Sequence, residues 1–144
     1  MARSRRDLYY VAVKVFLERG GKVFIFKDRY GDWDIPGGRI QRHEFKIPFE
    51  RVIARKIREE LGQKVRYRLG EPTVFMRHER RERFLRGAKV RIFAIGYRGT
   101  HLGGEIRLSP QHTEYRWVSK RGFRPERYFK GGWLAGIREY LRKT

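Results

Sequence analysis

The segment WDIPGGRIQRHEFKIPFERVIARKIREELG, residues 33–62, joins a glycine loop to a helix in a chain of 144 residues. The loop carries paired glycines, Gly37 and Gly38, and glycine lets a backbone turn sharply and approach a ligand closely. In the second half, apolar residues recur at every fourth position, which predicts a helix with one buried stripe. These apolar residues are Phe49, Ile53, Ile57 and Leu61.

Positions 56, 59 and 60 share one flank beside this stripe, because they are spaced i, i+3 and i+4 along the helix. Glu59 and Glu60 place two carboxylates on that flank, whereas Lys56 adds a cation. A divalent metal on a diphosphate needs hard oxygen ligands that are held rigidly opposite the phosphate oxygens. The two carboxylates meet this requirement, and the lysine opposes it.

The segment resembles the Nudix box, G-x5-E-x7-R-E-U-x-E-E-x-G-U, in which U is an aliphatic residue. A later stretch, LSPQHTEYRWVSK at residues 108–120, resembles the strand that follows the box in many members. The resemblance implies an α/β fold, a single domain whose mixed sheet lies between helices in an α/β/α sandwich. The residues that fit the box are Gly38, Glu44, Arg55, Ile57, Glu59, Glu60 and Gly62.

The resemblance also implies a Mg2+-dependent hydrolase of nucleoside diphosphate-linked substrates, which are nucleotides or RNA ends. In such an enzyme Glu59 and Glu60 hold the Mg2+ ion, and Arg55 orients the carboxylates. Water would be activated by another group, for which Glu114 is one candidate. The residues that shape the loop would be Gly37, Gly38, Glu44 and Gly62.

Four departures from the Nudix pattern bear on this chemistry. Three additional residues precede Arg55, and Gln63 replaces an aliphatic residue; both are minor, since surface loops accept insertions cheaply. Lys56 takes the place of the first glutamate of R-E-U-x-E-E, and Gln111 lies where family enzymes often carry a further acid. A lysine repels a metal ion, and an amide can neither take a proton nor neutralise a cation. Two of the four expected acids are therefore replaced.

Charge is the second informative property of the sequence. Lysine and arginine number 36 against 16 aspartate and glutamate, which gives a formal net charge of +20. The ion-pair networks of heat-adapted proteins need both signs in comparable number, and such an excess repels itself unless a polyanion neutralises it. We therefore predict an RNA partner, rRNA with neighbouring ribosomal proteins, for a ribosome-associated protein or ribosomal component.

The predicted RNA contacts lie in four basic segments: an arm at 1–7, a strand at 64–69, a hairpin tip at 77–86 and an aromatic-rich connector at 120–130. Each segment also has an interpretation without RNA, as a frayed terminus, a charged edge strand, a solvated loop or a connector packed on the core. The cations in these segments are Arg3, Arg5, Arg6, Lys64, Arg66, Arg68, Arg77, Arg80, Arg81, Arg83, Arg86, Lys120, Arg121 and Arg124.

Three other residues have chemistry of interest. His78 and His112 have no partner at metal-binding spacing, so we interpret them as ordinary loop residues or phosphate contacts. Trp33 lies beside the glycine loop, where we expect it to pack under the loop; stacking on a base is the alternative.

The remaining sequence predicts one domain at 8–144 after the basic arm at 1–7. There is no cysteine, which excludes disulfides, thiolate zinc sites and cysteine nucleophiles. No apolar run has the length of a membrane span and the N-terminus lacks the apolar core of a signal peptide, so we expect a cytoplasmic protein without a membrane partner. Strands are predicted at 8–17, 22–27, 64–69, 73–76, 89–97, 105–108 and 113–119, and a closing helix at 133–141.

Two functions of different classes stay open at this point. An RNA-binding protein that keeps the fold but has a degenerate metal site is the interpretation that the sequence favours, because Lys56 and Gln111 weaken the site while the net charge favours RNA. A Mg2+-dependent hydrolase is the alternative, which the retained Glu59 and Glu60 keep open.

Overall fold

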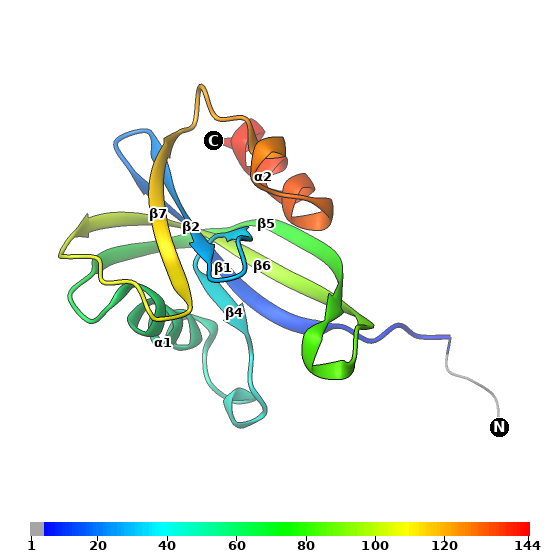
Figure 1. Ribbon diagram of the computed structural model, residues 1–144. Helices are drawn as coiled ribbons and strands as arrows, with labels where there is room; N and C mark the ends of the chain where they lie inside the picture. The colour runs from blue at the N-terminus through cyan, green and yellow to red at the C-terminus, as the bar shows by residue number, and fades with distance from the viewer. Residues whose placement is uncertain (1–4) are drawn as a thin grey trace.

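A mixed sheet forms the centre of the protein in a computed structural model that describes residues 5–144 (Figure 1). Arg3 of the predicted basic arm lies outside the described residues. The helices are α1 (Phe49–Leu61) and α2 (Gly131–Lys143). The strands are β1 (Tyr10–Arg19), β2 (Lys22–Asp28), β3 (Trp33–Asp34), β4 (Gly37–Arg39), β5 (Arg66–Glu82), β6 (Ala88–Gly103) and β7 (His112–Ser119).

The strands follow the order β3-β2-β1-β6-β5, with β4 paired to β1 and β7 paired to β2. β1 and β6 run parallel, with Tyr10 opposite Ile92 and Glu18 opposite Thr100. The other strand pairs are antiparallel. β1 therefore lies at the middle of the sheet, and the glycine loop at β4 is attached directly to it.

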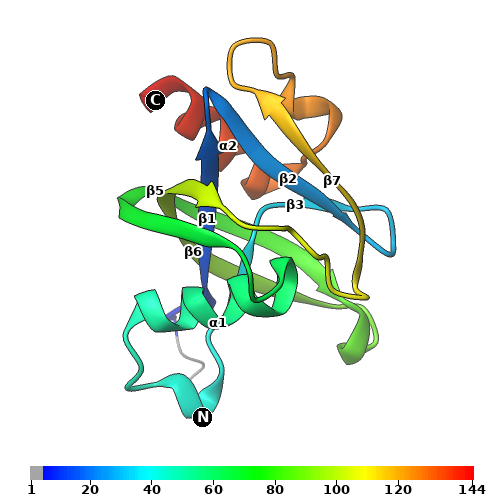
Figure 2. The same ribbon diagram turned by 90° about the vertical axis from the view of Figure 1, so that its left-hand side faces the viewer.

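The two helices cover opposite faces of the sheet, as Figures 1 and 2 show. Successive side chains of β1 alternate between these faces. Val13 and Leu17 are fully buried in the core that contains α1. Phe16 belongs to the core that contains α2, where its ring stacks on Tyr140 with 4.1 Å between ring centroids. Each fully buried side chain of this size contributes roughly 1.5–3 kcal/mol. The predicted α/β/α sandwich is therefore confirmed.

The predicted stripe of α1 is correct for Ile53, Ile57 and Leu61, which are buried, and wrong for Phe49. Phe49 is the first residue of α1 and is 38% exposed, because the core begins one turn further along the helix. Val52 is buried in its place.

The segment 104–111 is not a strand, which corrects the predicted strand at 105–108. Instead, β6 runs on to Gly103, and the chain then crosses to β7 along the C-terminal end of α1. The backbone N–H of Arg107 donates to the carbonyl of Leu61 at 2.9 Å, and that of Ser109 donates to the carbonyl of Glu60 at 3.2 Å. These bonds satisfy carbonyls at the end of α1 that have no partner within the helix.

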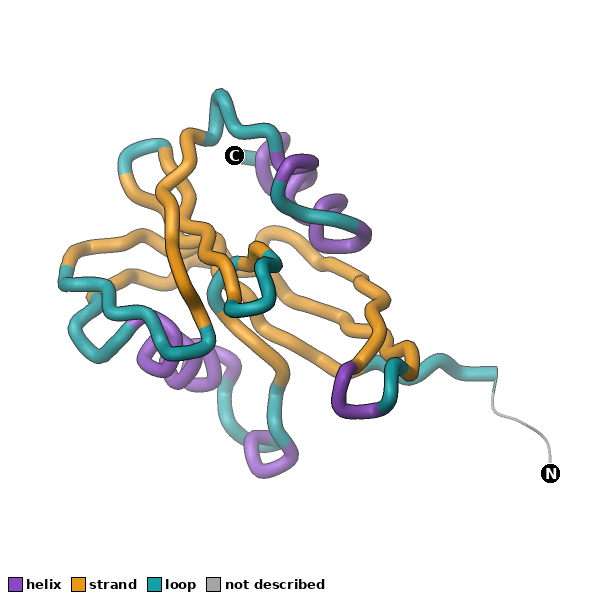
Figure 3. The backbone as a smooth tube through the Cα atoms, viewed as in Figure 1, coloured by secondary structure: helices purple, strands orange, loops and turns teal. Residues whose placement is uncertain are grey.

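β5 and β6 form one long hairpin, in which pairing extends from Arg66 opposite Gly103 to Glu82 opposite Ala88. The predicted tip at 77–86 is therefore mostly strand, and the turn itself is short and contains a 3-10 helix at Arg83–Leu85 (Figure 3). Within residues 5–144 no helix is both long and apolar enough to cross a membrane.

Candidate functional site

The glycine loop lies against the central strand. β4 pairs antiparallel with β1, so that Gly37 lies opposite Lys14 and Gly38 opposite Val13. Gly37 has a φ of +130°, a conformation that L side chains rarely adopt. A further backbone hydrogen bond attaches the loop to β1, because the N–H of Val15 donates to the carbonyl of Pro36 at 2.9 Å.

Glu60 connects the loop to α1. Its Oε1 accepts a hydrogen bond from the backbone N–H of Gly37 at 2.8 Å, and its side chain is buried. Burial raises the pKa of Glu60 to about 7, against the opposing charges of Lys14 and Lys56. Nε2 of His112 lies 3.9 Å from Oε2 of Glu60. Glu60 is thus a structural anchor of the loop, and it carries a proton for part of the time near neutral pH.

Arg55 lies between Glu44 and Glu59. It donates two hydrogen bonds of 2.7 Å to Glu44, which is buried, and one of 3.1 Å from Nη1 to Oε1 of Glu59. The Arg55 guanidinium holds the pKa of the Glu44 carboxyl below its usual range in spite of burial. The backbone N–H of Gln41 also donates to Glu44 at 3.0 Å. The structure therefore brings together Glu44, Arg55 and Glu59, three residues that the sequence predicted for the site.

Lys56 lies on the same flank, between Gly38 and Glu59. A Cβ atom added at Gly38 would be only 2.7 Å from Cε of Lys56 and 3.1 Å from its Nζ, so the lysine chain lies directly over this glycine. The Nζ is 3.5 Å from Oε2 of Glu59. Burial tends to raise the pKa of Glu59, but the hydrogen bond from Arg55 and the charge of Lys56 outweigh it and lower the pKa.

The residues of this flank do not fit a Mg2+ ion. Magnesium takes near-octahedral oxygen ligands and needs its carboxylates ionised and free to bind. Glu59 is paired with two cations, Glu60 is hydrogen-bonded to the loop, and the ammonium of Lys56 lies beside them. Nowhere in residues 5–144 do three His, Asp or Glu side chains gather as a metal would require. Gln111 is exposed and adds no charge.

Sequence reasoning missed a buried ion pair beside the loop. Lys14 is 5% exposed, and its Nζ donates to the two carboxylate oxygens of Asp34 at 2.9 and 3.0 Å and to the carbonyl of Ile35 at 3.2 Å. The signal for it was a lysine in the apolar strand LYYVAVKVFL. His112 is also not the loop residue that the sequence suggested, because it begins β7 and its ring stacks on Phe26 with 3.8 Å between centroids.

A cleft of about 650 Å³ lies next to Asp34 of this ion pair, between β3, the C-terminal part of β5 and the start of α2. Trp33 packs edge-on against Tyr128 with 5.2 Å between centroids, in the segment before α2, and it lines the cleft as well. Cations and aromatic rings make up most of the wall, together with three aspartates. The cations are Arg80, Arg81, Arg83, Arg127 and Lys130, and the aromatic residues are Trp33, Tyr128, Phe129 and Trp133.

The other predicted RNA contacts do not converge on this cleft. Arg66 and Arg68 lie near the start of β5, at the far end of the strand from the hairpin turn, and Lys64 precedes them. Lys120, Arg121 and Arg124 follow β7, and Lys120 is paired with Glu18 at 3.3 Å. Exposed cations outside the cleft include Arg5, Arg6, Arg77 and Arg86. Figure 1 shows the start of β5, the hairpin turn and the segment after β7 at three separate ends of the molecule.

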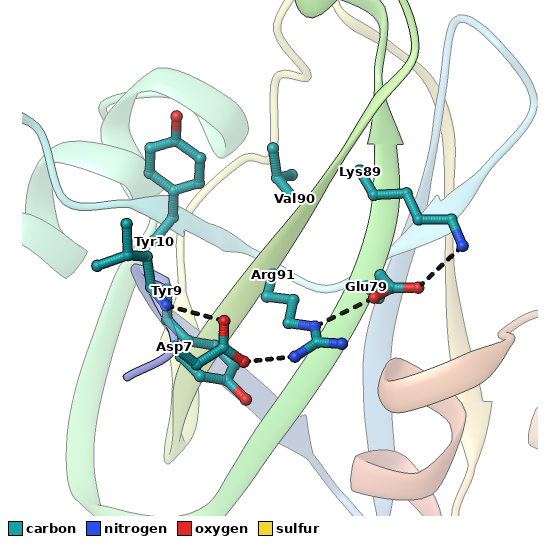
Figure 4. Close-up of a pocket in the computed structure, with 8 residues that line it drawn as sticks. Asp7, Tyr9, Tyr10, Glu79, Lys89, Val90 and Arg91 are labelled. Carbon is teal, nitrogen blue, oxygen red and sulfur yellow. Dashed lines mark hydrogen bonds and ion pairs between the residues drawn. The ribbon is translucent and has the colours of Figure 1, made fainter. Parts of the chain in front are cut away.

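A second hollow of about 520 Å³ lies at the N-terminal end of β1 (Figure 4). Its charges are matched, because Arg91 bonds to Asp7 and to Glu79, and Lys89 lies 3.6 Å from Glu79. The electrostatic attraction for an anionic ligand is therefore weaker here than in the cleft, where cations outnumber acids. The cleft and the glycine loop therefore form the candidate site.

Comparisons with known proteins agree with this fold. Residues 8–134 match the family model of the NUDIX domain. No curated protein matches the sequence significantly. Among solved structures, a MutT protein from Methanosarcina mazei Go1 has a TM-score of 0.75 and 21% identity, over 97% of this chain and 98% of that chain. An ADP-ribose pyrophosphatase from Streptococcus suis has a TM-score of 0.65 and 12% identity, over 94% and 92%. At these identities the likeness shows the fold alone.

Proposed function

Because the chain belongs to the NUDIX domain family, we propose that it binds nucleoside diphosphate-linked compounds, nucleotides or RNA ends, across the glycine loop and the adjoining cleft. The observation that carries this proposal is the cleft itself, which combines cations with aromatic rings next to the loop. The pair Lys14–Asp34 joins the two parts, since Asp34 lines the cleft while Lys14 lies opposite Gly37.

The wall of the cleft suits both halves of such a ligand. Arginine presents a planar fork that binds phosphate oxygens bidentately, and Arg80 and Arg81 both line the cleft. Trp33 and Trp133 supply aromatic surface to the cleft, of the kind against which bases pack, and Trp133 is itself stacked on His78 with 4.6 Å between ring centroids. One structural neighbour is named an ADP-ribose pyrophosphatase, which supports a diphosphate ligand.

Hydrolysis of the bound diphosphate is the reaction that the comparisons favour, since the structural neighbours include named hydrolases. Glu59, Glu60 and Arg55 stay the catalytic candidates for it. Their arrangement around Lys56 does not fit Mg2+, so no hydrolytic step through a metal is derived from it. Binding is the part of the function that the geometry supports best.

Isothermal titration calorimetry of the full chain tests the proposal. We expect ADP-ribose to bind more tightly than adenosine, and Arg81→Gln to weaken ADP-ribose about tenfold, because a hydrogen bond to a charged group is lost. Arg138→Gln on the exposed face of α2 is the matched control and should bind as the parent does. Equal affinity for ADP-ribose and adenosine would refute the proposal. Product release from ADP-ribose, with and without Mg2+, measures hydrolysis in parallel.

RNA binding is the second candidate, and the cations of the hairpin favour it. Arg80, Arg81 and Arg83 are all exposed, at the distal end of β5 and in the turn that follows it. Neutralising all three should weaken binding to a single-stranded RNA and flatten its salt dependence, because fewer counterions are released. The control neutralises Arg138, Arg142 and Lys143 on α2, which changes the net charge equally. If both triple variants bind alike, the hairpin is not an RNA contact. The ribosomal setting stays a prediction from the net charge.

A further inference from the structure

The ammonium of Lys56 lies at the meeting point of the glycine loop and α1. Its methylene chain covers Gly38, because a Cβ atom added to this glycine would lie only 2.7 Å from Cε of Lys56. Its Nζ is 3.5 Å from Oε2 of Glu59, and its charge acts on Glu60, whose Oε1 accepts a hydrogen bond from the backbone N–H of Gly37. The side chain of Lys56 is only 22% exposed, and its contacts with Gly38 and Glu59 keep the ammonium beside the loop.

Positive charge on this flank already balances the carboxylates. Arg55 and Lys56 both pair with Glu59, and Lys14 and Lys56 both oppose the raised pKa of Glu60. A divalent cation placed here would add two further positive charges beside Lys56, whereas Glu59 is already paired with two cations and Oε1 of Glu60 is bonded to Gly37. Protein cations therefore already pair with the carboxylates of Glu44 and Glu59.

We propose that Lys56 serves as the resident cation of this site, so that the protein binds the diphosphate of its ligand without a divalent metal. The ligand class rests on the function proposed above, whereas the exclusion of the metal does not. An ammonium offers three N–H donors and one positive charge, which suit phosphate oxygens that approach Nζ of Lys56. The glycine is required because a side chain at position 38 would displace the lysine from this place.

The first test uses Mn2+ alone, followed by the electron paramagnetic resonance signal of the free ion. The parent should leave the signal of free Mn2+ unchanged at protein concentrations where Lys56→Glu removes about one ion per chain, because the variant restores an oxygen ligand and removes the repulsion. Lys46→Glu, which makes the same charge change in the exposed segment before α1, should behave as the parent. Equal Mn2+ binding by the parent and Lys56→Glu would overturn the proposal.

The second test needs no variant. Calorimetric titration of the parent with ADP-ribose should give the same dissociation constant, within twofold, in EDTA and in Mg2+. A requirement for Mg2+ would overturn the proposal. Lys56→Gln keeps a side chain of similar length without charge, and it should weaken ADP-ribose binding about tenfold in EDTA while still binding no Mn2+. Its Mn2+ result stands even if Lys56→Glu does not fold.

The two proposals fail in different ways. If the parent binds neither ADP-ribose nor Mn2+ while Lys56→Glu binds Mn2+, the proposed ligand is wrong and the role of Lys56 as a resident cation is supported. If the parent binds ADP-ribose only together with Mg2+, the proposed ligand is correct and the role of Lys56 is refuted.

Discussion

Two adjacent glycines meet different constraints in the loop. A Cβ atom at Gly37 would lie 2.1 Å from the backbone carbonyl oxygen of Val13, and the φ of +130° is itself strained for any other residue. At Gly38 the nearest atom would be Cε of Lys56, which is the end of a flexible side chain and can move away. Gly37 is therefore needed for the fold, whereas Gly38 is needed for the position of Lys56.

Alanine substitutions separate these two requirements. Gly37→Ala should lower the free energy of unfolding by more than about 1 kcal/mol, because its native conformation is incompatible with a side chain. Gly38→Ala should change it by no more than about 0.5 kcal/mol, since only the lysine moves. Urea unfolding followed by circular dichroism measures both. Similar losses for the two variants would show that Gly38 also has a backbone constraint.

At the scale of elements, one ion pair holds α1 to the segment that precedes it. Glu44 ends a short 3-10 helix at Arg42–Glu44, and Arg55 lies in the middle of α1, eleven positions later. The three additional residues between them do not prevent the two hydrogen bonds of 2.7 Å. The insertion is taken up near Pro48, the residue before α1, which leaves the anchor intact.

Removing Arg55 should be costly because Glu44 would stay buried without its partner. Arg55→Met keeps the length of the side chain, and we expect a loss of about 3 kcal/mol in unfolding free energy, as for other broken buried pairs. Arg51→Met lies on the exposed side of the same helix and should change stability by less than about 0.5 kcal/mol. A loss below about 1 kcal/mol for Arg55→Met would mean that Glu44 finds water or another donor.

Local patterns predicted most of the elements correctly. The alternation at 64–69 gave outward cations and inward Val65, Tyr67 and Leu69, because the side-chain period of a strand is fixed by the backbone. Motif spacing likewise placed Arg55 and Glu59 on one side of the helix, where the two side chains form an ion pair. What depends on distant pairing was missed: Lys14 becomes a partner of Asp34 only once β3 has packed beside β2, and 104–111 is held by the end of α1.

At the scale of the whole molecule, Glu18 joins three parts of the chain. Its carboxylate accepts hydrogen bonds from Arg98 of β6 at 2.9 and 3.0 Å, from Lys120 after β7 at 3.3 Å, and from the hydroxyl of Tyr140 in α2. Burial tends to raise the pKa of Glu18, but the bonds from Arg98 and Tyr140 and the charge of Lys120 outweigh it, so the pKa is lowered. The charge of Glu18 therefore helps to hold α2 on the sheet.

This lowered pKa predicts a pH dependence with a definite sign. A carboxyl whose pKa is lower in the folded state stabilises the fold above its unfolded pKa, and the stabilisation is lost as the pH falls through the folded pKa. The stability difference between the parent and Glu18→Gln should thus be full above pH 4.5 and shrink below it. Urea unfolding at several pH values measures the difference. Glu71→Gln, at an exposed residue of β5, is the control. A difference that is constant with pH would show that the shape of the side chain, and not its charge, is what matters.

The parallel pairing of β1 with β6 has a consequence for biosynthesis. Residues 10–18 leave the ribosome early, but their partners on one edge, residues 92–100, are made only after the loop, α1 and β5. Until then that edge of β1 has free N–H and C=O groups and apolar side chains beside it, which is the condition under which strands associate wrongly. Pairing over such a sequence separation is also slow. The central strand of the mature sheet therefore keeps one edge unpaired until β6 has been made, and β2 waits longer still, because its partner β7 follows β6.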